Sequence, residues 1–431
     1  MKKRASTLSF FVLAFVLLLY SCGTQALPNS YIPNSDHQYM QVGSGAATVQ
    51  QTEDGCYVIR NGYLYYIEEG ADILLPLCSK ADCLHDKEAK IPLLHTKKEE
   101  QERLDKCNAC VDAMEMDDAT ICYSDGYLYC LNPIARIEGI GYMLPALYRC
   151  APDGSQKELI RYWSEDVQIT DWCVHRGVLY YVEQKFASAK DGVRRMCSLY
   201  AIPIKGMNHR PDVIFETEET LEVMTLNRLA CYGDYLYCTL IAYASGNEPL
   251  TEENAIEYLY RKTFVYTISD RQIGEIKAPG MTKYQVIQGL DFWQDRIIFN
   301  VYDYMNKDQE CAPLYIADLD GSDVQVLIED APVQHETDGQ YLYLFDLHTS
   351  YRNGEDSTYW TYNSDMELVD TFQVPFDSNY GYGRALGGYP QAYIPIRTIQ
   401  GEERMWSLAY WDKSKIGTYN GGMIEVEYIT R

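Results

Sequence analysis

Hydrophobic and polar positions along this 431-residue chain follow a short pattern that recurs many times. Each copy is a polar turn followed by aromatic and aliphatic residues, as in Asp125-Gly126-Tyr127-Leu128-Tyr129. Such side chains pack well on a pleated sheet, and Asp-Gly turns supply the positive φ angles that tight hairpins need. The pattern therefore predicts short β-strands joined as hairpins. The copies lie at residues 61–66, 125–129, 176–181, 233–237, 294–299 and 338–343, with a degenerate seventh copy at 388–394.

A second phrase, a strand pair around a polar turn, lies between these copies. Leu147 to Cys150 leads through Asp153-Gly154 to Glu158, and residues 314–317 lead through Asp320-Gly321 to 324–328. Two hairpins make a four-stranded unit, and a four-stranded unit that recurs along the chain is typical of a propeller blade. The sequence thus predicts an all-β fold, a β-propeller of about seven four-stranded blades, with six or eight also compatible. We expect the final strand, 423–429, to share a blade with residues 47–60 and close the ring, which removes an exposed edge.

The N-terminal segment has the pattern of a secretory signal. Lys2, Lys3 and Arg4 precede an apolar run, residues 10–19, that is shorter than the roughly 20 residues of a membrane span. Leu19-Tyr20-Ser21-Cys22-Gly23 then resembles the lipobox of bacterial lipoproteins, with Tyr20 bulkier than usual. We therefore predict a signal peptide over residues 1–21 and a lipid on Cys22. Cleavage after Ala26, giving a soluble secreted protein, is the alternative.

The remaining chain divides into a tether and one large domain. Residues 22–47 are rich in Pro, Ser, Asn, Gln and Gly and are expected to be flexible. Residues 48–431 form the predicted propeller, with a Cys-rich insertion at about 78–116 in the first blade. The formal net charge of −25 repels nucleic acid phosphates and anionic lipid headgroups. We therefore expect a monomer that binds no nucleic acid and touches the cell membrane, on its extracytoplasmic face, through the lipid on Cys22.

The repeated phrase resembles a known group of proteins. Asp-Gly-x-Leu-Tyr-Tyr-like runs are similar to TolB-like and LDL-receptor-like (DUF5050-type) β-propellers in surface lipoproteins of Firmicutes, particularly clostridial species. Residues 77–86, Leu-Cys-Ser-Lys-Ala-Asp-Cys-Leu-His-Asp, followed by Cys107-Asn108-Ala109, are similar to a Cys-rich first-blade signature of such proteins. The resemblance covers nearly the whole mature chain and implies a fold and a cell-surface location.

The same cysteine-rich phrase is the sharpest candidate for a chemical site. Cys78-x4-Cys83-x-His85 and Cys107-x2-Cys110 bring four thiols and one imidazole into about thirty residues. These ligand types suit tetrahedral zinc, although the spacings match no common zinc-finger pattern. A small insertion needs a staple, so one or two disulfides, a structural zinc, or reduced inert thiols remain open. The other cysteines mostly fall on predicted strands, where a thiol packs as a small hydrophobe.

Tyrosine is the conspicuous residue of the composition, with 39 copies. Most lie in the repeated strand phrases, where β-propensity accounts for them. Aromatic residues outside the repeat are better candidates for a binding face, because Tyr and Trp are favoured at binding hot spots. These candidate binding-face aromatics are Tyr302, Tyr304, Tyr351, Trp360, Tyr380 and Tyr382.

Two further signals bear on function. Asp318-x-Asp320-Gly321-x-Asp323 resembles the start of a calcium loop, but it lacks the glutamate at the twelfth position and coincides with a predicted hairpin turn. The sequence contains no Gly-x-Ser-x-Gly, His-Glu-x-x-His or P-loop motif. We therefore expect no catalytic residues and no cofactor apart from the possible zinc. The expected function is a non-enzymatic binding scaffold for a protein or peptide, and the alternative is a glycan-binding or carbohydrate-active propeller.

Overall fold

The structure is a computed structural model in which most of the predicted propeller can be described. The described residues, besides Ser30 and Ile32, are 49–52, 55–60, 62–68, 71, 73–83, 85, 106–111, 119–137, 141–189, 192–206, 209–217, 221–244, 259–303, 305–306, 309, 311–332, 334–337, 340–346, 357–374, 391–400, 403–412, 416 and 423–428. The predicted signal peptide, Cys22 and nearly all of the tether lie outside these residues. In the part of the chain that is described, no helix is long and apolar enough to cross a membrane.

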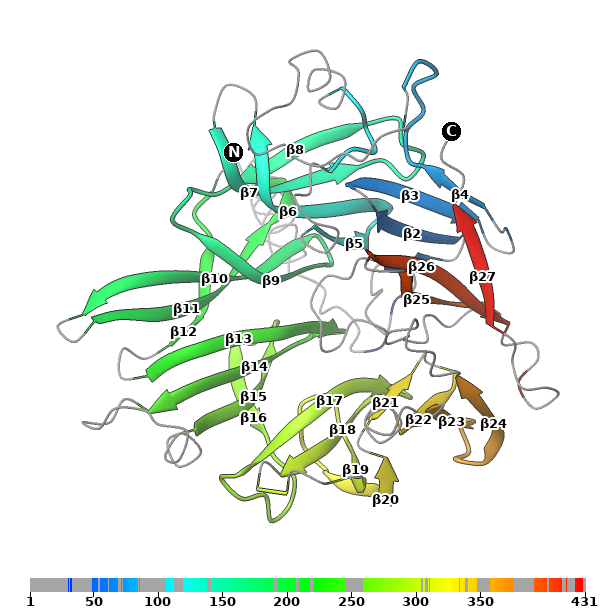
Figure 1. Cartoon of the computed structure of the whole chain (residues 1–431). Helices are drawn as coiled ribbons and strands as arrows, with labels where there is room; N and C mark the ends of the chain where they lie inside the picture. Colours follow the sequence, from blue (N-terminus) through cyan, green and yellow to red (C-terminus); the bar gives the residue numbers. More distant parts are fainter. Residues whose placement is uncertain are drawn as a thin grey trace, which may run out of the picture.

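The chain forms a β-propeller of six four-stranded blades arranged around a ring (Figure 1). Blades one to three are built from β1 (Val49–Thr52), β2 (Gly55–Arg60), β3 (Tyr63–Glu68), β4 (Ile73–Pro76), β5 (Thr120–Ser124), β6 (Tyr127–Ile137), β7 (Gly141–Cys150), β8 (Lys157–Tyr162), β9 (Gln168–His175), β10 (Val178–Ala189), β11 (Gly192–Pro203) and β12 (Asp212–Glu216), with the 3-10 helix η1 (Ile204–Gly206) after β11. Blades four to six are built from β13 (Leu221–Tyr232), β14 (Tyr235–Ala244), β15 (Leu259–Thr267), β16 (Gln272–Ile276), β17 (Gln285–Trp293), β18 (Arg296–Asp303), β19 (Cys311–Ala317), β20 (Gln325–Pro332), β21 (Gln334–Thr337), β22 (Leu342–Phe345), β23 (Ser357–Tyr362) and β24 (Leu368–Val374).

The repeated turn phrase marks the same hairpin in five of the six blades. It joins the first two strands of blades two to six, as Gly126 does between β5 and β6 with a φ of +77°. In blade one, Asn61-Gly62 instead joins β2 and β3, because β1 is an additional strand before the phrase. The all-β prediction and the four-stranded unit are therefore confirmed, with the repeat shifted by one strand in the first blade.

The C-terminal strands explain why there are six complete blades rather than seven. The degenerate seventh copy runs into β25 (Gln391–Gln400), which continues through β26 (Glu403–Asp412) to β27 (Met423–Tyr428). This three-stranded meander joins the first blade, giving a seven-stranded sheet in the order β1-β2-β3-β4-β27-β26-β25. The final strand thus shares a sheet with the N-terminal strands, as predicted. However, it pairs in parallel with β4, at Ile73 and Leu74, and not with residues 47–60.

The hydrophobic core lies between neighbouring blades. One cluster joins blades four and five through Tyr232, Tyr237 and Phe292, whose rings lie 4.6 Å (Tyr232–Phe292) and 5.4 Å (Tyr237–Phe292) apart. The apolar residues of the strand phrases therefore face adjacent sheets, which is why strands such as β22 are buried along their length. Most of the repeated tyrosines serve this packing, as their positions in the sequence predict.

Candidate metal centre and inter-blade cleft

Three cysteines and one histidine of the predicted Cys-rich site converge beside the first blade. The thiol sulfurs of Cys78, Cys83 and Cys107 and an imidazole nitrogen of His85 all lie within 4.8 Å of one another. His85 and Cys107 are buried, and Cys78 and Cys83 are half-buried. Cys110, the fifth predicted member, is not in this group. It is buried and forms an isolated β-bridge with Tyr63.

Backbone hydrogen bonds place the two halves of this cluster on strand β3. The loop after β4 starts where the Leu77 N–H donates to the Leu64 carbonyl at 2.8 Å. The segment 106–111 is held by the Leu64 N–H, which donates to the Ala109 carbonyl at 2.7 Å. Both bonds converge on Leu64, so the cysteines before and after residues 86–105 arrive at one place.

The second blade supports the same cluster from outside. The carbonyl of Gly154, in the β7–β8 turn, accepts hydrogen bonds from the Asn108 side-chain amide at 2.8 Å and from the Ser79 N–H at 3.3 Å. The Lys157 ammonium donates to the Cys110 carbonyl at 2.6 Å. The described ends of the predicted insertion, residues 78–83 and 106–111, thus contact the neighbouring blade.

The electrostatic surroundings distinguish the thiols of the cluster. Burial raises the pKa of Cys78, but hydrogen bonds from the backbone N–H groups of Lys80 and Asn108 and from its two thiol neighbours outweigh burial and lower it overall. Burial and the nearby Cys78 sulfur raise the pKa of Cys107 to about 12. Cys78 is therefore the thiol of this group that most readily becomes a thiolate.

The strand cysteines behave as the sequence predicts. Their thiols are buried, and the sulfurs of Cys173 and Cys231 lie 3.5 Å apart in a hydrogen bond. Desolvation raises the pKa of Cys197 and Cys150 to about 11. The buried strand cysteines that were predicted to pack as hydrophobes are Cys122, Cys130, Cys150, Cys173, Cys197, Cys231 and Cys238.

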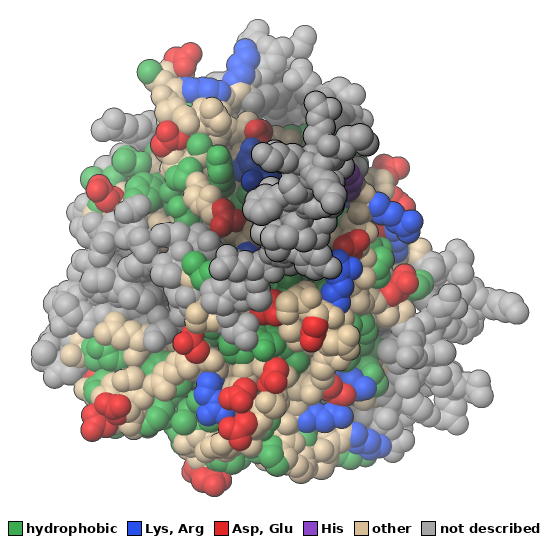
Figure 2. Space-filling model, turned by 180° about the vertical axis from the view of Figure 1, so that it is seen from behind, with side chains coloured by type: hydrophobic (Ala, Val, Ile, Leu, Met, Phe, Trp, Pro, Cys, Tyr) green, Lys and Arg blue, Asp and Glu red, His purple; other side chains and the backbone are tan. Residues whose placement is uncertain are grey.

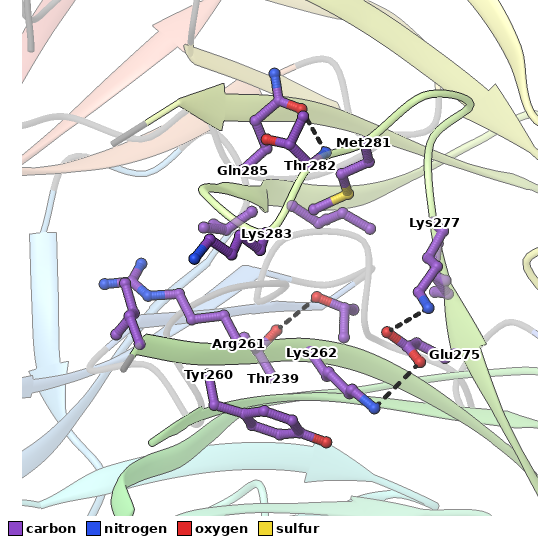
Figure 3. A pocket seen from close by; sticks show the side chains of 15 residues that line it. Thr239, Tyr260, Arg261, Lys262, Glu275, Lys277, Met281, Thr282, Lys283 and Gln285 are labelled. Carbon is purple, nitrogen blue, oxygen red and sulfur yellow. Dashed lines mark hydrogen bonds and ion pairs between the residues drawn. The ribbon is translucent and has the colours of Figure 1, made fainter. Parts of the chain in front are cut away.

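A cleft of about 280 Å³ lies between blades four and five (Figure 3). One wall is formed by β15 and β16, and the other by the connection from Lys277 to β17. Turns hold this connection: the Met281 N–H donates to the Ala278 carbonyl at 3.2 Å, and the Thr282 N–H donates to Oε1 of Gln285 at 2.9 Å.

The cleft concentrates positive charge on a strongly acidic chain. Arg261, Lys262, Lys277 and Lys283 line it, and Glu275 is the carboxylate among its described lining residues. Oxygens of Glu275 lie 3.1 Å from the Lys277 ammonium and 3.5 Å from that of Lys262. In Figure 3 this triad lies at one end, while the head groups of Arg261 and Lys283 lie toward the other. Partial burial lowers the pKa of Arg261 to about 10, so it stays charged at neutral pH.

The aromatic residues predicted for a binding face are only partly described. Tyr302 on β18 and Trp360 on β23 lie in different blades, and both are half-buried. Trp360 packs against the core cluster between blades five and six. The others, Tyr304, Tyr351, Tyr380 and Tyr382, lie outside the described residues.

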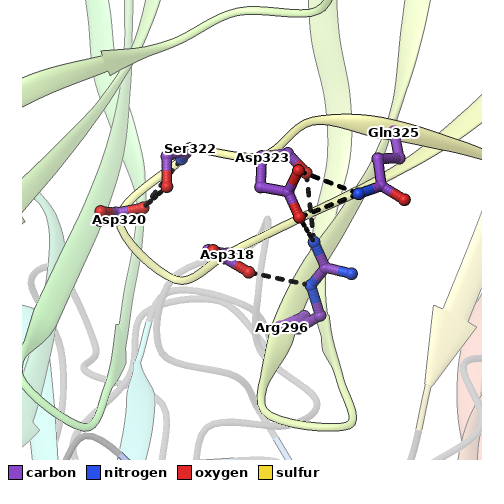
Figure 4. Close-up of polar contacts among 6 residues, drawn as sticks. All are labelled: Arg296, Asp318, Asp320, Ser322, Asp323 and Gln325. Atoms are coloured by element: carbon purple, nitrogen blue, oxygen red, sulfur yellow. Dashed lines mark hydrogen bonds and ion pairs between the residues drawn. The ribbon is translucent and has the colours of Figure 1, made fainter.

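The aspartate-rich turn between β19 and β20 is organised by an arginine (Figure 4). Arg296 Nε lies 3.2 Å from Asp318, and its terminal nitrogen lies 3.2 Å from Asp323. Asp320 accepts hydrogen bonds from the N–H and hydroxyl of Ser322 at 2.9 and 2.6 Å. These contacts are those of a hairpin turn, as expected, and the Arg296 guanidinium contacts two of its three aspartates.

The comparisons with known proteins find distant similarity to several solved structures. No protein-family model matches the chain, and no curated protein matches it. Among solved structures, an oligogalacturonate lyase in complex with manganese has 11% identity and a TM-score of 0.49, over 89% of each chain. An uncharacterized protein from Listeria monocytogenes has 10% identity and a TM-score of 0.44, over 71% of this chain and 81% of that one. The β-propeller domain of the Trilobed protease from Pyrococcus furiosus has 10% identity and a TM-score of 0.43, over 72% and 84%.

Proposed function

We propose that this chain is a membrane-anchored extracytoplasmic lipoprotein whose propeller is a non-enzymatic binding scaffold. We propose further that its partner is a protein or peptide, and that an acidic segment of this partner enters the cleft between blades four and five. The anchor rests on the leader and on Cys22, as argued from the sequence. The binding role rests on the cleft.

The observation that carries the binding role is the charge of this cleft. The chain has 62 acidic and 37 basic residues, yet four basic side chains meet in one cleft around a single described carboxylate. On the face shown in Figure 2, by contrast, acidic side chains lie at many separate places, several beside Lys or Arg. A cationic cleft with low-dielectric walls attracts anions and orients them. The ligand chemistry that fits it is a run of carboxylates.

A peptide fits the lining better than a sugar does. A glycan-active cleft would present two or three convergent carboxylates below exposed aromatic rings. The described lining has Glu275, already paired with two lysines, and Tyr260, which is half-buried beneath Lys262. Long Lys and Arg side chains, whose stems cover apolar surface, are suited to a carboxylate-bearing chain.

A binding measurement with defined acidic probes tests this proposal. The full chain, purified in detergent, is titrated with a fluorescent oligoglutamate peptide and with an oligo-uronate. We expect the peptide to bind, and Lys283→Glu to weaken it about tenfold or more, since a close interfacial charge pair contributes roughly 1.5 kcal/mol or more. Lys205→Glu is the matched control, because Lys205 is an exposed lysine on η1, away from the cleft.

The outcomes separate the two ligand classes. Loss of peptide binding in the cleft variant, with binding retained in Lys205→Glu, supports the proposal. Equal losses in both variants refute it, because they indicate a general charge effect. Uronate binding without peptide binding favours the glycan alternative instead.

The anchor is tested independently. Cells expressing the chain are labelled with a fatty acid, and we expect label in the wild type and none in Cys22→Ala. An unlabelled wild type, or a label that survives the substitution, rules out lipidation at Cys22.

A further inference from the structure

We propose that Cys78, Cys83, His85 and Cys107 bind one Zn²⁺ ion in a closed, structural site beside the first blade. The site lies apart from the inter-blade cleft, and it does not depend on the proposed binding function. Its role is to join the loop after β4 to the segment 106–111.

The geometry of the four donors fits a tetrahedral zinc ion. Zinc binds sulfur at about 2.3 Å and nitrogen at about 2.0 Å, so the ligand atoms of a tetrahedral site with three sulfurs and one nitrogen lie roughly 3.5–3.8 Å apart. The four donor atoms here already lie within 4.8 Å of one another. Small side-chain rotations therefore close the site. Three sulfurs and one imidazole nitrogen are a ligand set that structural zinc sites use, and four protein ligands leave no position for a substrate.

A disulfide explains the cluster less well. One disulfide among Cys78, Cys83 and Cys107 would use only two of the four donor atoms that converge here. The remaining nearby thiol, Cys110, is outside the group. Zinc employs all four donors at once, with the three thiols losing their protons to solvent and the histidine binding as neutral imidazole.

The surroundings of the cluster resemble the outer shell of a metal site. The side-chain amide of Asn108, next to Cys107, donates to the Gly154 carbonyl at 2.8 Å, which fixes the segment that carries Cys107. The Tyr63 ring packs edge-on against the His85 imidazole, with centroids 5.6 Å apart. Both ligating segments are also fixed by the β3 backbone, so the donors are held before any ion arrives.

The benefit of such an ion follows from the chain path. Residues 86–106 separate His85 from Cys107, and a segment of this length is too short to supply a large core of its own. An ion that joins both ends closes this loop and stabilises the insertion against the first two blades. Bound zinc also keeps the thiolates from oxidation in an extracytoplasmic environment.

Metal analysis of the full chain tests the proposal. Protein purified without chelator is analysed by inductively coupled plasma mass spectrometry, and we expect about one zinc per chain. Replacement by Co²⁺ should give the visible absorption of a tetrahedral cobalt–thiolate site. Cys107→Ser should lose the metal, with at least a tenfold weaker affinity. Cys110→Ser should keep it, and it is a matched control because Cys110 lies three residues away and is equally buried.

Three results overturn the zinc site. The first is a disulfide among Cys78, Cys83 and Cys107, seen as a mass shift on reduction of the intact chain. The second is wild-type protein with no zinc and no cobalt spectrum after reconstitution, a measurement that holds even where a variant fails to fold. The third is metal loss that is equal in Cys107→Ser and Cys110→Ser.

Discussion

Gly154, in the β7–β8 turn of the second blade, lies in close contact with the loop that follows β4 of the first blade. It has a φ of +69°, and a Cβ atom there would lie 2.6 Å from the Leu77 carbonyl carbon and 2.7 Å from the Cys78 nitrogen. Both are backbone atoms of the loop that carries the cysteine cluster, so they cannot rotate away. Gly154→Ala must therefore push this loop off the β7–β8 turn.

The loss in free energy of unfolding expected for Gly154→Ala has two parts, one from the backbone conformation and one from the displaced neighbours. An alanine in the left-handed region costs about 1 kcal/mol by itself. Displacing the packed backbone adds roughly 1–3 kcal/mol, and weakening the hydrogen bond from Asn108 adds about 1 kcal/mol. Gly126→Ala isolates the first part, because Gly126 has a φ of +77° and nothing lies within 4 Å of the added Cβ. We expect a loss of about 3–5 kcal/mol for Gly154→Ala and about 1 kcal/mol for Gly126→Ala.

Urea unfolding followed by circular dichroism measures both free energies under the same conditions. Equal losses in the two variants would refute the reasoning, since the close approach of Gly154 would then have no energetic effect. Metal content gives a second readout. If the loop carries a zinc ligand, Gly154→Ala should also lower the zinc affinity, whereas Gly126→Ala should not.

Three further predictions concern charged groups in the sheets. Burial raises the pKa of Asp171 to about 7. The contribution of Asp171 to stability is therefore complete at low pH and is lost as the pH rises from about 4 to about 7. The urea midpoint of the wild type relative to Asp171→Asn should fall over this range, and a constant difference would contradict the assignment. Burial lowers the pKa of His335 to about 4. The wild type should therefore lose stability relative to His335→Gln as the pH falls from about 6.5 to 4. No change in this difference is expected between pH 7 and 8. Arg296→Met should cost at most about 1 kcal/mol, because Asp318 and Asp323 are more than half exposed, and the cost should shrink in high salt if the ion pairs cause it.

The sequence predicts those parts of the fold that depend on local pattern. The turn phrases fix the strands, because Gly126 and its equivalents need positive φ and the following aromatic run needs a buried sheet. Local pattern says little about which edge the final strand joins. Met423–Tyr428 alternates equally well beside β1 or β4, and the choice depends on contacts distant in sequence.

The two candidate sites also differ in how far the sequence predicts them. The Cys-rich phrase predicts that Cys78, Cys83, His85 and Cys107 lie together. It does not separate Cys110 from the other thiols, because the β-bridge between Cys110 and Tyr63 depends on contacts distant in sequence. The inter-blade cleft has no sequence signature. Arg261 and Lys283 become neighbours in one cleft only when β15 packs beside the connection to β17, and neither residue lies in a recognisable motif.

The polar groups buried between blades explain how the cleft keeps its shape. Sheets in a propeller share few backbone hydrogen bonds with their neighbours, so their spacing depends on side chains. The hydroxyl of Tyr237, on blade four, donates to the Leu319 carbonyl of blade five at 2.6 Å, and that of Tyr232 donates to Asp295. On either side, buried carboxylates make matching contacts: Asp171 accepts from the Leu229 N–H of blade four at 2.9 Å, and Asp291 accepts from the Thr337 N–H of blade six at 2.9 Å.

These contacts give the tyrosines and aspartates a joint role that composition alone does not suggest. An unmade hydrogen bond at a buried group costs about 1–3 kcal/mol, so each contact permits only one separation of its two blades. Blades three to six are therefore held in a fixed series, with the cleft between the middle pair. The walls that carry Arg261 and Lys283 are consequently preorganised, and a ligand that enters the cleft needs little rearrangement of the sheets.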